Sequence, residues 1–297
     1  MFRLSLTAAL LLGSISCGSR PPTVQPPAPV VPPGAPPAPP AAPPAPPPRG
    51  GQEVIRLGPS AMRYVAHQVI HIEQEFQGVR QPLDVGLQIY FAVTIAGPAD
   101  STGYATTVTI DSIAPDSGTT APMGINLSVA KGLSFTGRLT PTGEFRNPVA
   151  SDTVLAQTLA PVVGSFRNFF PRVPAAGVTL GASWTDTVTT SDRAAGAVTV
   201  TTINHSRATA WEQRNGVRSL RLEVASTFTI RGAGDQNGQP FEVNGTGQRT
   251  GVDFIAVDGR YLGGEASDST SMTINLPVQS VTIPRTQVSR STVMVRP

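Results

Sequence analysis

Alternation of apolar and polar residues dominates two long segments of the chain. Apolar side chains recur at every second position in residues 85–95, and the same alternation returns at Leu220, Leu222, Val224, Phe228 and Ile230. A period of two is typical of a β-strand with one buried face. In the second segment the polar positions include Arg221, Glu223 and Thr227, so we expect that face to meet solvent. The pattern predicts long strands that share one core.

Turn residues separate further segments of this kind. Asn215-Gly216 and Asp258-Gly259 stand between β-type runs, and such pairs supply the positive φ of tight hairpins. The strands expected in the second half lie near residues 184–190, 197–212, 217–231, 241–257, 260–275 and 279–295. Because strands do not alternate with helices, the pattern favours antiparallel hairpins over a parallel sheet.

One segment, residues 152–170, has apolar residues three and four apart and is the best helix of the domain. Ser151 can cap it, Asp152 favours its N-terminus, and Pro171 ends it. Pro161 should kink it or split it into two short helices, because proline removes an internal hydrogen bond.

These elements predict one β-rich domain over residues 51–297, with halves at about 51–150 and 172–297. The expected fold class is mainly β: a curved antiparallel sheet or incomplete barrel in two halves, joined by one α-helix. Residues 62–76 fit either a helical stripe or one face of a strand. We favour a strand, since valine, isoleucine and tyrosine dominate and Gly78 follows as a turn.

The first residues have the pattern of a bacterial lipoprotein signal peptide over residues 1–17. A basic start ending at Arg3 precedes an apolar run, residues 4–12, and small residues lead to Cys17. Cys17 is the only cysteine and is expected to be the acylated lipid-attachment residue, although Ser14 stands where such sites usually carry leucine. The alternative is ordinary cleavage beside an incidental cysteine. No later segment has the roughly 20 apolar residues of a membrane-spanning helix.

A proline-rich linker, residues 18–50, follows the leader. Residues 21–48 contain sixteen prolines. Such a segment prefers polyproline II and could extend about 85 Å at ~3.1 Å per residue. We interpret it as a disordered stalk; recognition of its PxxP motifs by a partner is the alternative.

Charge excludes nucleic acid as a partner. Arg3, Arg20 and Arg49 precede residue 51, and the remaining 19 of the 22 basic residues equal the 19 acidic ones. The pI near 9.5 therefore reflects the leader and linker, not a basic binding face. A single cysteine forms no internal disulfide, so stability must come from a hydrophobic core.

Catalytic motifs are absent: the sequence has no Gly-x-Ser-x-Gly, no His-Glu-x-x-His and no phosphate-binding glycine loop. The chain has three histidines, of which His67 and His71 are four apart. On a helix these two could bind a metal, whereas on a strand they would lie about 13 Å apart on a solvated face. We favour the strand, and expect no metal, no cofactor and no enzymatic activity.

Two further features have a functional and a structural interpretation. A glycine-rich stretch with Asp235 and Asn237, residues 232–238, superficially resembles a calcium loop but lacks the terminal glutamate, so a hairpin turn is preferred. Trp184 and Trp211 could line a ligand site, but large aromatic residues in a β protein are usually core.

The order of parts resembles bacterial lipoproteins with a LolA-like incomplete β-barrel. The features that carry the resemblance are Cys17, the helix over residues 152–170, and the segments Phe170-Pro171-Arg172-Val173-Pro174 and Gly181-Ala182-Ser183-Trp184. The resemblance implies a curved sheet that wraps a helix and can shelter an apolar ligand. It implies no catalytic residue.

We therefore expect an exported, non-enzymatic lipoprotein, attached through its lipid to the outer membrane and facing the periplasm. Ser19, two residues after the cysteine, is compatible with that destination. The domain would bind a lipid or another apolar molecule; the alternative is a structural or protein-interaction module on a stalk. Inward-facing Ala92, Gly137 and Ala225 would leave space for a ligand, whereas inward leucine, phenylalanine and isoleucine would fill it.

Overall fold

The computed structural model describes residues 53–296, except 77, 121–125, 164–165, 167, 193–196 and 237–238. Cys17 and the proline-rich linker lie outside the described residues. The described residues form eleven strands: β1 (Ser60–Phe76), β2 (Val79–Asp100), β3 (Gly103–Pro115), β4 (Ser134–Leu139), β5 (Phe145–Ala150), β6 (Ser183–Asp192), β7 (Ala197–Arg214), β8 (Val217–Gln236), β9 (Gln239–Ala256), β10 (Tyr261–Leu276) and β11 (Val281–Arg296). All six strands expected in the second half are present within a few residues, and residues 62–76 belong to a strand, as predicted.

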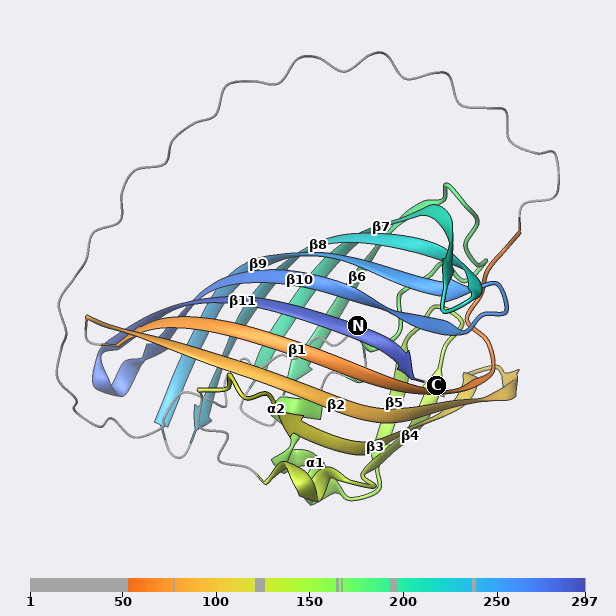
Figure 1. Ribbon diagram of the computed structural model, residues 1–297. Coiled ribbons are helices and arrows are strands. Elements are labelled where there is room, and N and C mark those ends of the chain that lie inside the picture. The colour runs from red at the N-terminus through yellow and green to blue at the C-terminus, as the bar shows by residue number, and fades with distance from the viewer. Residues whose placement is uncertain are drawn as a thin grey trace, which may run out of the picture.

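All eleven strands belong to one antiparallel sheet in the order β5-β4-β3-β2-β1-β11-β10-β9-β8-β7-β6. Almost every strand pairs with its neighbours in the chain, and the pairing of β1 with β11 joins the two halves. The sheet is not closed, since β5 and β6 form its two edges. The long strands arch side by side in Figure 1. The expected fold class is confirmed.

The expected helix is shorter than predicted and is divided. Two short helices, α1 (Thr153–Thr158) and α2 (Ala160–Val163), replace a continuous helix to residue 170. The division lies beside Pro161, as proline at this place predicts. The cap also differs, because the Asp152 carboxylate accepts a hydrogen bond from the Leu155 N–H at 2.9 Å. Ser151 instead accepts one from the N–H of Ser134 and so ties the segment to β4.

Short 3₁₀ turns occur at η1 (Leu127–Ala130) and η3 (Pro277–Gln279). None of the helices in the described part of the chain is long and apolar enough to cross a membrane. Hairpins turn where the sequence predicts them: Asn215 and Gly216, with φ of 51° and 74°, form a two-residue turn between β7 and β8. The turn between β9 and β10 is longer, and of its predicted pair Gly259 alone has a positive φ, 88°. Asparagine and glycine tolerate this left-handed backbone better than other residues.

Alternation gives each strand an inner face, directed toward the core, and an outer face. In β1, Tyr64, Ala66, Ile70 and Ile72 are buried, while the alternating residues His71 and Glu73 are exposed. In β2 the apolar residues predicted from residues 85–95 are all buried. Exposed Glu223, Ala225 and Thr227 confirm the solvated face expected in β8. Period two therefore fixes which side chains reach the interior.

The main core lies where the segment after α2 packs on the inner face. Phe169 is fully buried there, and its ring lies 5.1–5.2 Å from the rings of Tyr64, Phe91 and Tyr261 and 4.9 Å from Phe170. The preferred edge-to-face geometry recurs in these contacts. This end of the inner face is filled by aromatic side chains.

A second cluster of apolar residues occupies the opposite end of the inner face. Its buried members come from β7 to β11: Val198, Ile230, Phe241, Val243, Met272, Ile274, Leu276 and Ile283. The two clusters share no residue, and the inner face between them carries polar side chains. The candidate site is built on this polar interval.

Candidate functional site

A row of polar side chains crosses the inner face of six neighbouring strands. Cross-strand pairing places in register Asp186 of β6, Asn204 of β7, Ser226 of β8, Arg249 of β9, Asp268 of β10 and Ser289 of β11. We call this set the polar row. The Asn204 amide donates to Asp186 at 3.1 Å and accepts from Ser226 at 2.8 Å, and Ser289 donates to Asp268 at 2.6 Å. Hydrogen bonds thus join Asp186, Asn204 and Ser226 on one side of Arg249 and Asp268 with Ser289 on the other. The Arg249 Nε and Nη2 atoms between them have no hydrogen-bond partner among the described residues.

Arg249 is the cation of the polar row and is 5% exposed. Burial lowers the pKa of its guanidinium, and the charges of Asp268 and Asp253 oppose that change. Asp253 also accepts a hydrogen bond from the buried Tyr261 hydroxyl at 2.9 Å. Burial, and then the Asp253 charge, raises the pKa of Tyr261. Arg249 is thus a buried charge with carboxylates nearby.

A second arginine, Arg285 of β11, lies four residues before Ser289 of the polar row, on the same face and toward the second cluster. It is 2% exposed and donates from Nη2 to the Gln287 amide oxygen at 3.1 Å. Its Nε and the amide oxygen of Gln74, its cross-strand partner in β1, have no hydrogen-bond partner among the described residues. Burial alone lowers the pKa of Arg285 to about 10. No described carboxylate forms a salt bridge with it.

A small hollow of about 30 Å³ lies beside the β6 end of the polar row. Asn204 and Asp253 line it from the sheet, and Asn168 and Arg172 line it from the segment that precedes β6. A space of this size holds about one water molecule. It therefore marks where the packed segment meets polar residues of the sheet.

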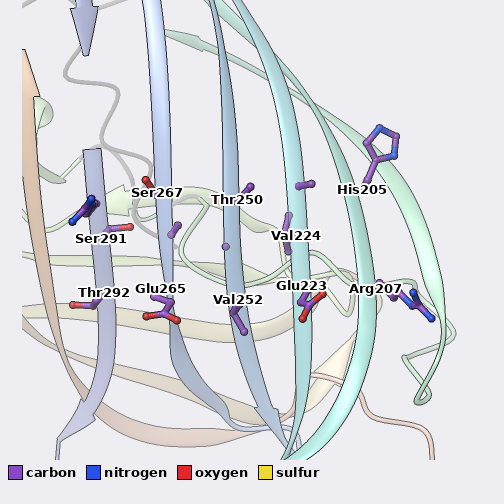
Figure 2. A pocket seen from close by; sticks show the side chains of 14 residues that line it. His205, Arg207, Glu223, Val224, Thr250, Val252, Glu265, Ser267, Ser291 and Thr292 are labelled. Carbon is purple, nitrogen blue, oxygen red and sulfur yellow. The ribbon is translucent and has the colours of Figure 1, made fainter. Parts of the chain in front are cut away.

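The outer face of β7 to β11 carries a wide groove of about 660 Å³ (Figure 2). Two rows of outward side chains line it: Arg207, Glu223, Val252, Glu265 and Thr292, and next to them His205, Ala225, Thr250, Ser267 and Arg290. Glu223 forms a salt bridge with Arg221 at 3.2 Å, and His205 shares a hydrogen bond with Thr185. In Figure 2, Glu223 and Glu265 stand on the strands that flank Val252.

A second groove of about 630 Å³ continues along the same face. Its lining is rich in hydroxyl groups, among them Thr201, Thr227, Thr246 and Ser269. Exposed charges and hydroxyls are well hydrated, and solvent screens their interactions. The outer grooves therefore present a wide but hydrated surface to a ligand, whereas the inner face presents polar groups that are shielded from water.

The two neighbouring histidines lie on the outer face of β1, so they do not form the helical pair that would bind a metal. His67 pairs with Asp116, and the His71 Nδ1 shares a hydrogen bond with the Asp84 carboxylate at 2.8 Å. The described residues contain no group of three or more histidine, cysteine, aspartate or glutamate side chains that could hold a metal ion.

The other candidate residues have mainly structural surroundings. Trp184 donates to the Arg172 carbonyl at 3.2 Å, and Trp211 packs under the Arg218 guanidinium; both rings contact the main core. Residues 232–236 are the end of β8, in a hairpin with β9, while Asn237 and Gly238 lie outside the described residues.

The small residues considered as a source of internal space do not provide it. Ala92 and Ala225 lie on the outer face, since they alternate with the buried residues of β2 and β8. Gly137 faces inward, but a Cβ there would approach the Phe145 ring to 2.7 Å, so side chains already fill that position.

Arg249 and Arg285, the two buried arginines, were missed by sequence reasoning. The signal is their phase: Arg285 lies at an even number of residues from Ile283 and Val293 and so shares their buried face of the strand. A charged residue in phase with apolar neighbours marks a buried polar site.

Comparison with known proteins identifies no family for this chain. No protein family matches the sequence, and no curated protein matches it. Among solved structures, the crystal structure of Pseudomonas aeruginosa OccK2 (OpdF) is similar at 9% sequence identity, with a TM-score of 0.26, over 79% of this chain and 98% of that chain.

Proposed function

We propose that this protein is a non-enzymatic lipoprotein of the bacterial cell envelope that holds an amphiphilic small molecule on the inner face of its open sheet. The observation that carries this proposal is the order along the inner face: an aromatic core, a buried polar interval with two arginines, and a second apolar cluster. The resemblance to LolA-like lipoproteins points to the same role.

The free-energy cost of burying charged side chains favours a binding role over a purely structural one. Burying a charged group without full compensation costs several kcal/mol, and apolar residues of similar size usually stabilise a core more. In a domain with a purely structural role, Arg249 and Arg285 in the interior would add no stability. A ligand with one polar and one apolar end would use both the polar interval and the second cluster.

The most direct test of binding is native mass spectrometry and lipid extraction of the protein purified from its own membranes. We expect an amphiphilic molecule at about one per chain. A protein that is repeatedly empty, and that takes up no fluorescent lipid analogue, would contradict the proposal.

The envelope location rests on the leader and Cys17. We expect Cys17→Ala to move the protein from the membrane fraction to the soluble periplasmic fraction, because a thioether-linked lipid is the proposed anchor. Cell fractionation measures this. If the variant still sediments with membranes, the anchoring proposal is wrong.

A second candidate function, an interaction module, is favoured by the unpaired edge of β6. This ten-residue strand ends the sheet and is rich in threonine, so its backbone groups could pair with a strand of another protein. A photo-crosslinking residue at Thr189 should then give one defined product in intact cells. The same residue at Thr229, inside the sheet, is the control.

A further inference from the structure

Arg285 and Arg249 differ in how their charges are balanced. The field of Asp268 and Asp253 acts on Arg249, but burial alone shifts the pKa of Arg285. Among the side chains that the structure describes, the inner-face carboxylates Asp186, Asp253 and Asp268 lie within the polar row or beyond it, on the far side from Arg285. Both guanidinium groups have nitrogen atoms without a hydrogen-bond partner, but among the described residues only Arg249 has carboxylates nearby.

Arg285 stands at the boundary between polar and apolar surroundings. Its cross-strand partners are Gln74 of β1 and Met272 of β10, and Ile283 lies two residues away on the same face. Met272 and Ile283 belong to the second cluster, whereas Gln74 and Gln287 present amide groups. The guanidinium thus lies where the polar head group of a bound amphiphile would meet its apolar chain.

The unpartnered donor of Arg285 fits an anion. Its Nε–H has no hydrogen-bond partner among the described residues, whereas the unpartnered atom of Gln74 is an amide oxygen, an acceptor, and the Gln74 amide nitrogen donates to Gln81 at 3.2 Å. Internal water can satisfy such hydrogen bonds, but it does not balance a buried positive charge. A carboxylate or phosphate does both, and it forms the strongest, charge-assisted hydrogen bonds with arginine.

We propose that Arg285, with Gln287 beside it, forms an anion-binding site inside the sheet that takes the carboxylate or phosphate head of a ligand whose apolar chain lies against the second cluster. This inference rests on the proposed function and names the class of its ligand: an acidic amphiphile. A neutral amphiphile binds more weakly, because it leaves the arginine charge unbalanced.

The test is a native mass spectrometry titration of the full chain in a non-ionic detergent with dodecanoate, dodecyl phosphate, dodecanol and inorganic phosphate. We expect both acidic amphiphiles to bind and dodecanol to bind at least about tenfold more weakly, as loss of a charge-assisted pair predicts. Inorganic phosphate alone should bind weakly, because it lacks the chain. Whichever of dodecanoate and dodecyl phosphate binds more tightly shows whether the site prefers a carboxylate or a phosphate head group.

Arg285→Gln should weaken the binding of both acids about tenfold or more, and Arg285→Lys should retain part of it because the charge remains. Arg290→Gln is the matched control, since Arg290 lies on the outer face of the same strand and lines the groove of Figure 2. It should leave binding unchanged. If Arg290→Gln weakens binding and Arg285→Gln does not, the site is the outer groove and the inference fails.

Stability gives a readout that does not depend on the chosen ligand. Arg285→Met should raise the unfolding temperature of the ligand-free protein, because it removes an unbalanced buried charge. A clear decrease, with acid binding intact, would overturn the anion site. If dodecanol and the acids bind alike and Arg285→Gln changes neither, only the head-group inference fails. If no amphiphile binds, the proposed function fails.

Discussion

Single residues in the interior show how much the fold depends on satisfied polar groups. The buried Tyr261 hydroxyl donates to Asp253, and the Tyr64 hydroxyl donates to the Tyr261 carbonyl at 2.8 Å. These bonds connect the aromatic core to the polar interval. A buried acceptor that loses its donor bears the full cost of its desolvation.

We predict that Tyr261→Phe lowers the free energy of unfolding by about 1.5–3 kcal/mol, since a hydrogen bond to a charged group is lost in the interior. Chemical denaturation measures this. Tyr90→Phe is the matched control, because the Tyr90 hydroxyl bonds to Gln88 on the outer face, away from the core. Equal effects of the two substitutions would contradict the account of the buried network.

The outer face supplies a prediction of pH dependence at His71. The hydrogen bond with Asp84 is the main cause that raises its pKa, and Glu73 adds to it. A histidine with a raised pKa stabilises the folded state below the unfolded value of 6.5, and that contribution disappears as pH rises through the folded pKa. Asp84→Asn should therefore reduce stability more near about pH 5.5 than near about pH 9. The control is the same pair of denaturation measurements in a His71→Gln background. There Asp84→Asn should change the stability by the same amount at both pH values.

At the scale of elements, the strands were predictable, whereas the helical segment was predictable in its division beside Pro161 but not in its length. Period-two alternation acts over many residues, so each strand of the second half could be located from its own sequence. Phe166, Phe169 and Phe170 sit at helical spacing, but their packing on the inner face, rather than a helix, decides their conformation. Pro161 adds to this by interrupting the hydrogen bonds of a longer helix.

We predict that Phe169→Ala lowers the free energy of unfolding by about 3–5 kcal/mol, because it removes a fully buried ring from an aromatic cluster. Val154→Ala in α1 is the control, since Val154 is 73% exposed and its loss should cost less than about 0.5 kcal/mol. Thermal unfolding distinguishes them. A small effect of Phe169→Ala would mean that the segment after α2 does not hold the sheet in its observed shape.

At the scale of the whole molecule, the candidate site depends on contacts that a single sequence does not display. Arg285 and Gln74 are more than two hundred residues apart and become neighbours only through the pairing of β1 with β11. The polar row requires six strands to pair in one register. Alternation assigns each of these residues to the buried face, but only the order of strands brings them together.

The central claim is that the inner face, and not the outer groove, holds an acidic amphiphile. The most direct measurement is crosslinking of the full chain with a fatty acid that carries a photoreactive diazirine on its chain, followed by residue-level mass spectrometry. We expect labels on Met272, Ile274 and Ile283 of the second cluster, and their loss in Arg285→Gln. Labels on Val252 and Thr250 of the outer groove, unchanged by Arg285→Gln, would contradict the claim.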